Sequence, residues 1–201
     1  MTVSLVNYGL GNLGSVVNML KRVGAESRLV QTPEEILASE RLLLPGIGAF
    51  DTGMRLLNEQ GLVPAIREFA ASGKPLFGIC LGMQLLLDGS EEGVEPGLGL
   101  IPGTSKKFAE QPGVRVPHMG WNHAVATHDD PLMAGLDGES RFYFVHSYRV
   151  HVDDEKHSIL KCTYGITFDA AVQNDNIFGA QFHPEKSHKF GMQLLKNFAD
   201  L

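Results

Sequence analysis

The sequence predicts an α/β fold with an open, mostly parallel central sheet flanked by helices and a strand-rich second half. Three observations support this prediction. The chain has 201 residues, which fits a single domain spanning residues 1–201 with a sizeable hydrophobic core. Short, nearly all-apolar runs alternate with helical patterns in the first half, as in parallel sheets that are covered on both faces. From residue 105 onward, strand-like runs follow one another with few helical patterns between them.

The first half alternates predicted strands with predicted helices. The strands are expected at residues 2–8, 25–30, 41–46 and 75–79, and the helices at 12–24, 32–38 and 62–73. Gly24 and Gly73 end the first and third of these helices, as glycine commonly does. The helix at 32–38 has a clear start signal, because Thr32 can cap it, Pro33 can occupy its first position and Glu35 can complete a capping box.

The second half is predicted to contain mostly strands. The candidates are residues 142–152, 158–165, 167–173 and 177–182. The chain closes with an amphipathic helix predicted at 187–201, where apolar residues recur at helical spacing: Phe190, Leu194, Leu195 and Phe198. No linker, internal repeat or low-complexity segment interrupts the chain, so one domain is the simplest interpretation.

Composition and charge exclude several classes of protein. The formal net charge is −6, so we expect no nucleic acid partner, because no basic excess is available to neutralise phosphates. No apolar run approaches the roughly 20 residues that a membrane-spanning helix needs, and the N-terminal stretch lacks the basic start of a signal peptide. The two cysteines show no spacing that suggests a disulfide framework. We therefore expect a cytoplasmic protein without a membrane partner.

Cys80 lies between the strand predicted at 75–79 and an apolar helical pattern, and it is flanked by Gly78 and Gly82. This G-x-C-x-G pattern is the cysteine version of a nucleophile elbow, a tight strand-to-helix turn that exposes the nucleophile. The helix that follows would favour a thiolate, and the N–H of Leu81 would stabilise an oxyanion. A small buried core residue is the alternative for Cys80. That alternative is the preferred interpretation of Cys162, which no glycine elbow surrounds.

His183 and Glu185 are the candidate base and orienting residue for a cysteine nucleophile. His183 follows the strand predicted at 177–182, and Pro184 separates it from Glu185. Residues two apart in an extended segment point to the same side, so the carboxylate can hold the tautomer of the imidazole. This H-P-E pattern is weak evidence alone and gains weight from the elbow upstream. A zinc site of the deaminase type is not expected, because the P-C-x-x-C part of that pattern is absent.

Two glycine-rich turns follow predicted strands, at residues 45–48 and 9–14. Pro45-Gly46-Ile47-Gly48 ends the strand at 41–46 and would direct a second backbone N–H toward a developing oxyanion, although an ordinary strand-end turn is the alternative. Residues 9–14 match the G-x-G-x-x-G fingerprint of a dinucleotide-binding oxidoreductase. That fingerprint requires an acidic residue at the end of the second strand, where this chain has Val30 and Gln31, so dinucleotide binding is disfavoured.

Motifs along the chain resemble those of the class I (triad) glutamine amidotransferases. The motifs are PGIGAF (45–50), GICLGMQ (78–84) and QFHPEKS (181–187). Two more, VPHMGWN (116–122) and YFVHSY (143–148), are similar to motifs of the glutaminase subunits of imidazole glycerol phosphate synthase. The resemblance begins at NYGLGNLGSV (7–16) and reaches the last helix, so it covers essentially the whole chain. It implies a flavodoxin-like arrangement of the sheet.

The resemblance also implies a mechanism. Cys80 would attack the side-chain carboxamide of L-glutamine, His183 would accept the thiol proton and later protonate ammonia, and Glu185 would fix the imidazole. By the same resemblance, the peptide at Ile47 would reorient to complete the oxyanion site. The remaining assignments are oxyanion donors at Leu81, Ile47 and Gly48, glutamine-binding residues at Gly46, Gln84, Ser147 and Tyr148, and partner-facing residues at Asn12 and Lys186.

The implied partner is a (β/α)8-barrel cyclase subunit that forms a heterodimer with this chain. It would receive the ammonia and make imidazole glycerol phosphate and an aminoimidazole carboxamide ribotide in histidine biosynthesis. No metal or organic cofactor is implied, and glutaminase activity is expected to stay low until the partner binds its ligand. A glutaminase subunit of another synthase, such as the pyridoxal phosphate type, and a scaffold with a degenerate triad are the alternatives.

Overall fold

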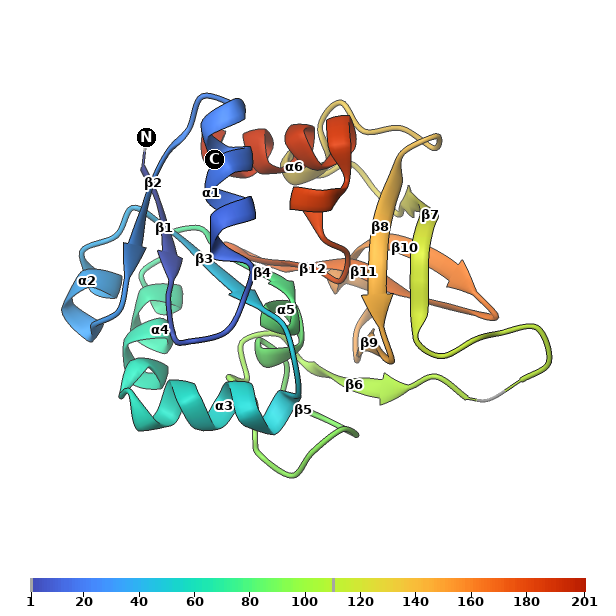
Figure 1. Ribbon diagram of the computed structural model, residues 1–201, viewed down its shortest axis with the longest axis horizontal. Coiled ribbons are helices and arrows are strands. Elements are labelled where there is room, and N and C mark those ends of the chain that lie inside the picture. The colour runs from blue at the N-terminus through green and yellow to red at the C-terminus, as the bar shows by residue number, and fades with distance from the viewer. Residues whose placement is uncertain (1, 110) are drawn as a thin grey trace.

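The computed structural model describes residues 2–109 and 111–201. Its centre is a 12-stranded sheet with helices on both faces (Figure 1). The main path through the sheet runs β2-β1-β3-β4-β12-β11-β10-β7-β8, and β5, β6 and β9 pair beside this path. The predicted α/β fold with a strand-rich second half is therefore confirmed.

The parallel part of the sheet comes almost entirely from the first half of the chain. It contains β1 (Thr2–Val6), β2 (Glu26–Val30), β3 (Arg41–Gly46) and β4 (Leu76–Cys80), and β12 (Ile177–Ala180) adds to it by pairing in parallel with β4. Every residue of β3 and β4 is buried, as their nearly continuous apolar sequences predict. Because β12 lies beside β4, their carboxyl ends meet at one edge of the sheet.

The antiparallel part comes mainly from the second half, and it differs from the prediction. Its strands are β7 (His118–Ala126), β8 (Arg141–His146), β9 (Tyr148–Val152), β10 (Ser158–Tyr164), β11 (Ile166–Asn174) and β6 (Gly103–Lys107), which is antiparallel to β9. The two-residue β5 (Gly89–Ser90) pairs with β6 in parallel. β5, β6 and β7 were not among the predicted strands. The single strand expected at 142–152 is wrong, because the chain breaks at Ser147 so that β8 pairs with β7 while β9 pairs with β6 and β11.

Helices cover the two faces of the sheet (Figure 1). α1 (Leu13–Arg22) and α6 (His188–Asp200) lie on one face, where Leu20 and Phe198 join one core cluster. α2 (Pro33–Leu37), α3 (Phe50–Glu59), α4 (Leu62–Ala71) and the short α5 (Leu81–Leu85) lie on the other. The capping box of α2 is present, with the Glu35 N–H donating to Thr32 Oγ1 at 3.3 Å. α3 was not predicted.

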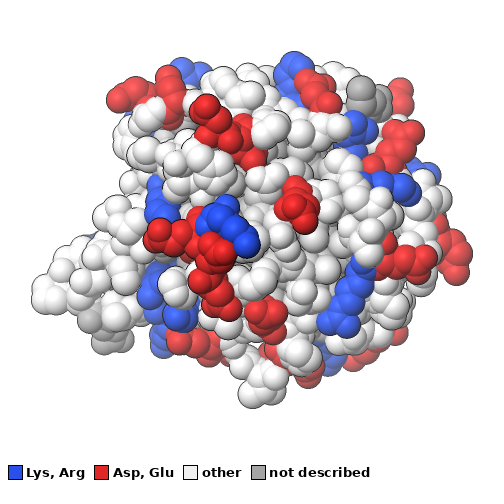
Figure 2. Space-filling model, turned by 180° about the vertical axis from the view of Figure 1, so that it is seen from behind, with Lys and Arg blue, Asp and Glu red and all other residues white. Residues whose placement is uncertain are grey.

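The surface carries mixed charge. On the face that Figure 2 shows, Lys and Arg side chains are dispersed among Asp and Glu side chains, so this face presents no continuous basic patch. Among residues 2–109 and 111–201, no helix combines the length and apolar character that crossing a membrane would require.

Candidate active site

Cys80 lies in a strained turn at the end of β4, directly before α5. Its φ of 55° and ψ of −112° form a backbone conformation that residues with a side chain rarely adopt. The flanking glycines are required by close packing. A Cβ at Gly78 would lie 2.6 Å from the carbonyl oxygen of Gly82, and a Cβ at Gly82 would lie 1.8 Å from that of Leu44. This is the geometry of the nucleophile elbow that the sequence predicts.

The Pro45–Gly48 turn lies directly beside this elbow. Gly46 is the register partner of Cys80 between β3 and β4. The packing there is tight, since a Cβ at Gly46 would lie 2.7 Å from the Tyr8 hydroxyl, which donates to the Pro45 carbonyl at 2.9 Å. Burial and, second, the proximity of Cys80 raise the pKa of Tyr8, so its hydroxyl remains a donor. Gly48, at φ 102°, supplies the backbone freedom for the turn to end here.

His183 is held by its backbone just after β12. Its N–H donates to the carbonyl of Tyr143 at 2.9 Å, and the Ser187 hydroxyl donates to its carbonyl oxygen at 2.6 Å. The 3₁₀ turn η3 (Pro184–Lys186) follows at once and returns Glu185 toward the imidazole. Backbone pairing to β8 and this turn therefore fix the position of the ring.

The imidazole of His183 shares the cavity wall with Cys80 and forms a hydrogen bond with Glu185. Its Nδ1 lies 2.8 Å from Glu185 Oε1, and the two side chains are only 4% and 1% exposed. Burial lowers the pKa of His183, but its hydrogen bonds with Cys80 and Glu185, together with the charges of these residues, outweigh burial and raise the pKa to about 9. The ring is therefore suited to hold a proton taken from a neighbouring acid.

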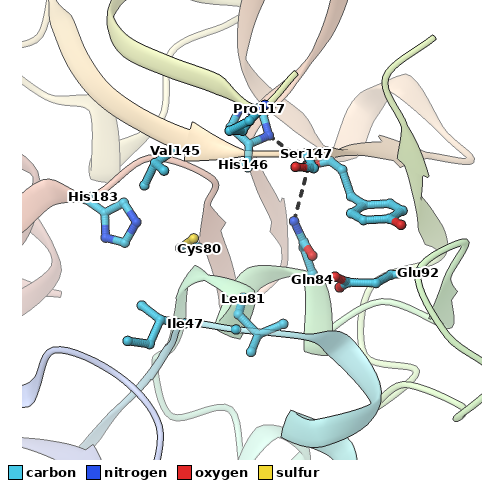
Figure 3. A pocket seen from close by; sticks show the side chains of 12 residues that line it. Ile47, Cys80, Leu81, Gln84, Glu92, Pro117, Val145, His146, Ser147 and His183 are labelled. Carbon is cyan, nitrogen blue, oxygen red and sulfur yellow. Dashed lines mark hydrogen bonds between the residues drawn. The ribbon is translucent and has the colours of Figure 1, made fainter. Parts of the chain in front are cut away.

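A cavity of about 340 Å³ opens above Cys80 (Figure 3). Most of the residues predicted for the site line it: Ile47, Gly48, Cys80, Leu81, Gln84, Ser147, Tyr148 and His183. Gly46 and Glu185 do not line the cavity but contact residues that do: Gly46 is the register partner of Cys80, and Glu185 is the hydrogen-bond partner of His183. The cavity is large enough for a small amino acid, and Cys80 and His183 form one side of it.

Gln84 is oriented by two hydrogen bonds of its amide nitrogen. Nε2 donates to Gln181 Oε1 at 2.9 Å and to the Tyr148 carbonyl at 3.3 Å. Its amide oxygen is directed to the side of the cavity where Glu92 lies (Figure 3). Gln181, which is fully buried, places its own Nε2 at 3.9 Å from the Cys80 sulfur. The amide of Gln181 therefore links the nucleophile to the predicted glutamine-binding residue Gln84.

Four cavity residues were not predicted: Glu92, Pro117, Val145 and His146. Glu92 Oε2 accepts the backbone N–H of Phe50, the first residue of α3. Glu92 comes from an acidic loop without motif character, so its sequence carried no signal of a place in the cavity. Gln181 also was not predicted, although its spacing of two from His183 in an extended segment was a usable signal.

The two predicted partner-facing residues lie outside the cavity lining. Asn12 is the exposed residue before α1, and its side chain makes no capping hydrogen bond. Lys186 is exposed in η3, with its Nζ 5.7 Å from the centre of the Tyr143 ring. Both side chains are available to a second protein.

Neither the second cysteine nor a metal cluster adds to this site. Cys162 lies in β10 and is 2% exposed in the core, where burial raises its pKa to about 12, as expected for an inert thiol. In the described part of the chain, no three His, Cys, Asp or Glu side chains lie close enough together to hold a metal ion.

The chain is similar to known proteins over almost its full length. The family model "Glutamine amidotransferase class-I" matches residues 4–201. Imidazole glycerol phosphate synthase subunit HisH 2 of Pseudomonas aeruginosa is 50% identical over 200 residues, which cover 99% of each chain. Imidazole glycerol phosphate synthase subunit HisH of Sulfurimonas denitrificans is 48% identical and covers 98% of this chain and 96% of its own.

A solved structure shares the fold at low sequence identity. The structure of PurLQS from Thermotoga maritima superposes with a TM-score of 0.78 at 21% identity, over 99% of this chain and 97% of that one. The glycine-rich turn at residues 9–14 is therefore part of an amidotransferase fold, and the oxidoreductase alternative is wrong. With a family model that covers nearly all of it and relatives about half identical end to end, the chain belongs to the class I glutamine amidotransferases, in the branch of the HisH glutaminase subunits of imidazole glycerol phosphate synthase.

Proposed function

We propose that this chain releases ammonia from L-glutamine through a Cys80-His183-Glu185 triad and delivers it to a partner subunit. One observation carries the proposal: Cys80, in a strained elbow, and His183 line the same cavity, and His183 Nδ1 lies 2.8 Å from the buried carboxylate of Glu185. A nucleophile, a base and an orienting group in this order are the arrangement that activates a thiol.

The reaction begins with proton transfer from Cys80 to His183. The sulfur attacks the side-chain carbonyl carbon of glutamine, and Glu185 stabilises the imidazolium through Nδ1. His183 then gives the proton to the leaving nitrogen, ammonia departs, and a glutamyl thioester remains on Cys80. Water, activated by the same imidazole, hydrolyses the thioester to glutamate and restores the thiol.

Backbone N–H groups on two sides of Cys80 are placed to stabilise the oxyanion of each tetrahedral intermediate. Leu81 follows the nucleophile and lines the cavity, so its N–H is one donor. The Ile47–Gly48 peptide borders the same cavity, and Ile47 is 46% exposed, so its side chain does not pin the turn in the core. A reorientation of this peptide would complete the site. Losing one such donor typically costs roughly a hundred- to a thousandfold in rate, which would account for an enzyme that is slow until its partner acts.

The amino-acid end of glutamine is assigned to the polar side of the cavity. The Glu92 carboxylate and the amide oxygen of Gln84 are suited to an α-ammonium group, because both accept hydrogen bonds and lie on the same side (Figure 3). Ser147 and Tyr148, at the break between β8 and β9, are suited to the α-carboxylate through hydroxyl and backbone N–H donors. Gly46 keeps the oxyanion turn close to Cys80.

The relatives are named as subunits of a synthase, which implies a partner subunit. We propose that this partner is a (β/α)8-barrel cyclase, that Asn12 and Lys186 lie in the heterodimer interface, and that the ammonia is used to make imidazole glycerol phosphate and an aminoimidazole carboxamide ribotide. The chain's own residues supply the whole hydrolytic mechanism, so the proposal includes no metal or organic cofactor. A cytoplasmic location stays a prediction.

The triad is tested with Cys80→Ala, using Cys162→Ala as the matched control. With the cognate barrel subunit and its nucleotide substrate present, Cys80→Ala should release no glutamate from glutamine, while the complex should still use added ammonia. Cys162→Ala should turn over near the wild-type rate, because its thiol is buried in the core in β10 and does not line the cavity.

Glutamate release by the Cys80→Ala complex would contradict the nucleophile assignment. Strong release by the isolated wild-type chain would leave the triad intact but refute the reorienting peptide as a switch. Absence of release by the wild-type complex would reject the proposed partner or the catalysis itself.

A further inference from the structure

A buried pair of histidines lies beside the cavity, outside the predicted triad. His118 in β7 and His146 in β8 are register partners, and their side chains meet with His118 Nδ1 at 3.0 Å from His146 Nε2. They are only 2% and 6% exposed. Buried imidazoles need a partner for each ring nitrogen, so the hydrogen bonds of the pair determine which nitrogens carry protons.

The Asn122 side chain determines the proton position in His118. Its Oδ1 accepts the N–H of His123 at 2.9 Å, and its Nδ2 donates to the Thr163 carbonyl at 3.0 Å. The same Nδ2 lies 3.4 Å from His118 Nε2. An amide nitrogen only donates, so Nε2 of His118 is the acceptor and its Nδ1 carries the proton. His118 therefore donates to His146.

The opposite end of the chain of hydrogen bonds requires the same direction. His146 Nδ1 lies 2.7 Å from the carbonyl oxygen of Tyr148. A carbonyl only accepts, so Nδ1 of His146 carries the proton and its Nε2 accepts from His118. Both ends thus agree on one arrangement: Asn122 donates to His118, His118 to His146, and His146 to the Tyr148 carbonyl.

This arrangement requires both imidazoles to be neutral. A second proton on either ring would place two donors against each other, and aromatic rings enclose the pair: Phe108, Phe144, Tyr164 and Phe168. The titratable groups that face it are Tyr164, stacked on His118 at 4.0 Å, and His183, whose positive charge opposes protonation of His146. Burial, as the main cause, lowers the pKa of His118 to about 4 and that of His146 to about 3.

The hydrogen-bonded chain ends at the residues assigned to glutamine. The Tyr148 carbonyl that accepts from His146 also accepts from Gln84 Nε2 at 3.3 Å. His146, Ser147 and Tyr148 all line the cavity. The strand breaks at Ser147, where the backbone is held from the β6 side: the Ser147 carbonyl accepts the N–H of Phe108 at 3.1 Å, and Tyr148 is the register partner of Lys107. The donor from His146 adds a side-chain constraint on the Tyr148 carbonyl, on the side that faces the cavity residue Gln84.

We propose that His118 and His146 are positioning residues for glutamine, acting as two neutral imidazoles that hold the Tyr148 carbonyl, and through it Ser147 and Gln84, in the binding geometry. This inference rests on the proposed function, because it assumes that glutamine occupies the cavity. It assigns a role to the histidines of the VPHMGWN and YFVHSY motifs that the triad leaves unexplained.

The protonation pattern is tested first, by two-dimensional NMR of the full-length wild-type chain with ¹⁵N-labelled histidine. His118 and His146 should each be neutral with the proton on Nδ1, the minor tautomer of free imidazole, and should not titrate between pH 5.5 and 8.5. His118→Asn and His146→Gln assign the two signals. An Nε2–H tautomer or a titration within that range for either residue would refute the proposal, and this test does not depend on any glutaminase activity.

The functional role is tested with two variants at one position whose side chains have the same branching and the same number of heavy atoms. In His118→Asn the side-chain nitrogen takes the place of Nδ1 and can still donate to His146, whereas His118→Leu has no donor. In the complex with the barrel subunit, the KM for glutamine of His118→Leu should rise about tenfold, and that of His118→Asn should stay within about threefold of wild type. The kcat at saturating glutamine should change much less.

A purely structural role predicts a different result. Loss of folded protein would lower the apparent kcat of both variants without changing KM. An unchanged KM in His118→Leu, or equal KM increases in both variants, would therefore refute the positioning role while leaving the triad intact. If the wild-type complex itself failed to hydrolyse glutamine, the proposed function would fall instead, and the NMR result would still decide whether the hydrogen-bonded chain exists.

Discussion

The strain at Cys80 predicts that glycine is better tolerated there than at the other buried cysteine. Cys80 has φ 55° and ψ −112°, whereas Cys162 lies in the regular strand β10 and is not among the residues with positive φ. Replacing each cysteine by Ala and by Gly removes the sulfur in all four variants. The difference in the free energy of unfolding between the Gly and Ala variants then depends only on the backbone conformation and on one methyl group.

The magnitude follows from two opposing contributions. Glycine in place of alanine costs about 0.5–1 kcal/mol in backbone entropy, and the lost methyl costs about 0.8 kcal/mol, at either buried position. Only at Cys80 does glycine also relieve backbone strain, which is worth about 1–3 kcal/mol for a residue held in such a conformation. The Gly-minus-Ala difference in the free energy of unfolding should therefore be about 1–3 kcal/mol more favourable at position 80 than at position 162.

Urea denaturation of the four variants, followed by circular dichroism at one pH, measures this double difference. A thermal scan gives an independent reading, because 1 kcal/mol corresponds to about 2–4 °C in Tm for a chain of this length. The entropic and methyl contributions cancel between the two sites, so the comparison isolates the strain. A double difference within about 0.5 kcal/mol of zero would mean that the elbow is not strained, and the steric account of Cys80 would be wrong.

The remaining predictions concern the groups around His183. Glu185→Gln should lower the glutamine-dependent kcat of the complex by roughly a hundred- to ten-thousandfold, because an amide does not stabilise the imidazolium or hold its tautomer. Ammonia-dependent synthesis should stay unchanged. A full glutamine-dependent rate would contradict the orienting role of Glu185. The pKa of His183 is raised from 6.5 to about 9 on folding, so its contribution to stability is complete below pH 6.5 and is lost as the pH rises through 9. Urea denaturation at pH 6.5 and pH 9.5 should show a loss of up to about 3 kcal/mol in the wild type that is much smaller in His183→Gln. Equal pH dependence in the two proteins would show that other groups cause it.

The sequence by itself determined the parts of this protein that depend on neighbouring residues. The glycines around Cys80 predict a sharp turn because any side chain there would strike the backbone, and the structure shows those contacts at Gly78 and Gly82. The capping box of Thr32 and Glu35 likewise forms as its spacing predicts. Each of these signals lies within a few residues of the sequence, so it can be recognised without knowledge of the fold.

Only the tertiary structure decided which distant residues share the site. The parallel pairing of β12 with β4 brings His183 to Cys80, and the hydrogen bond from the His183 N–H to the Tyr143 carbonyl in β8 fixes the histidine backbone. Glu92 reaches the cavity because its loop is tied to the start of α3. No local pattern encodes these approaches, since they depend on strand order and on hydrogen bonds between distant segments.

The histidine pair shows the physical reason most clearly. The sequences around His118 and His146 carry no local signal that the two side chains meet, and no strand was predicted around His118. The register between β7 and β8 places the two rings in contact, and the direction of their hydrogen bonds is then imposed by Asn122 and the Tyr148 carbonyl. The residue type determines only which hydrogen bonds an imidazole is able to form. The fold determines which groups are its partners, and these partners determine which ring nitrogen carries the proton.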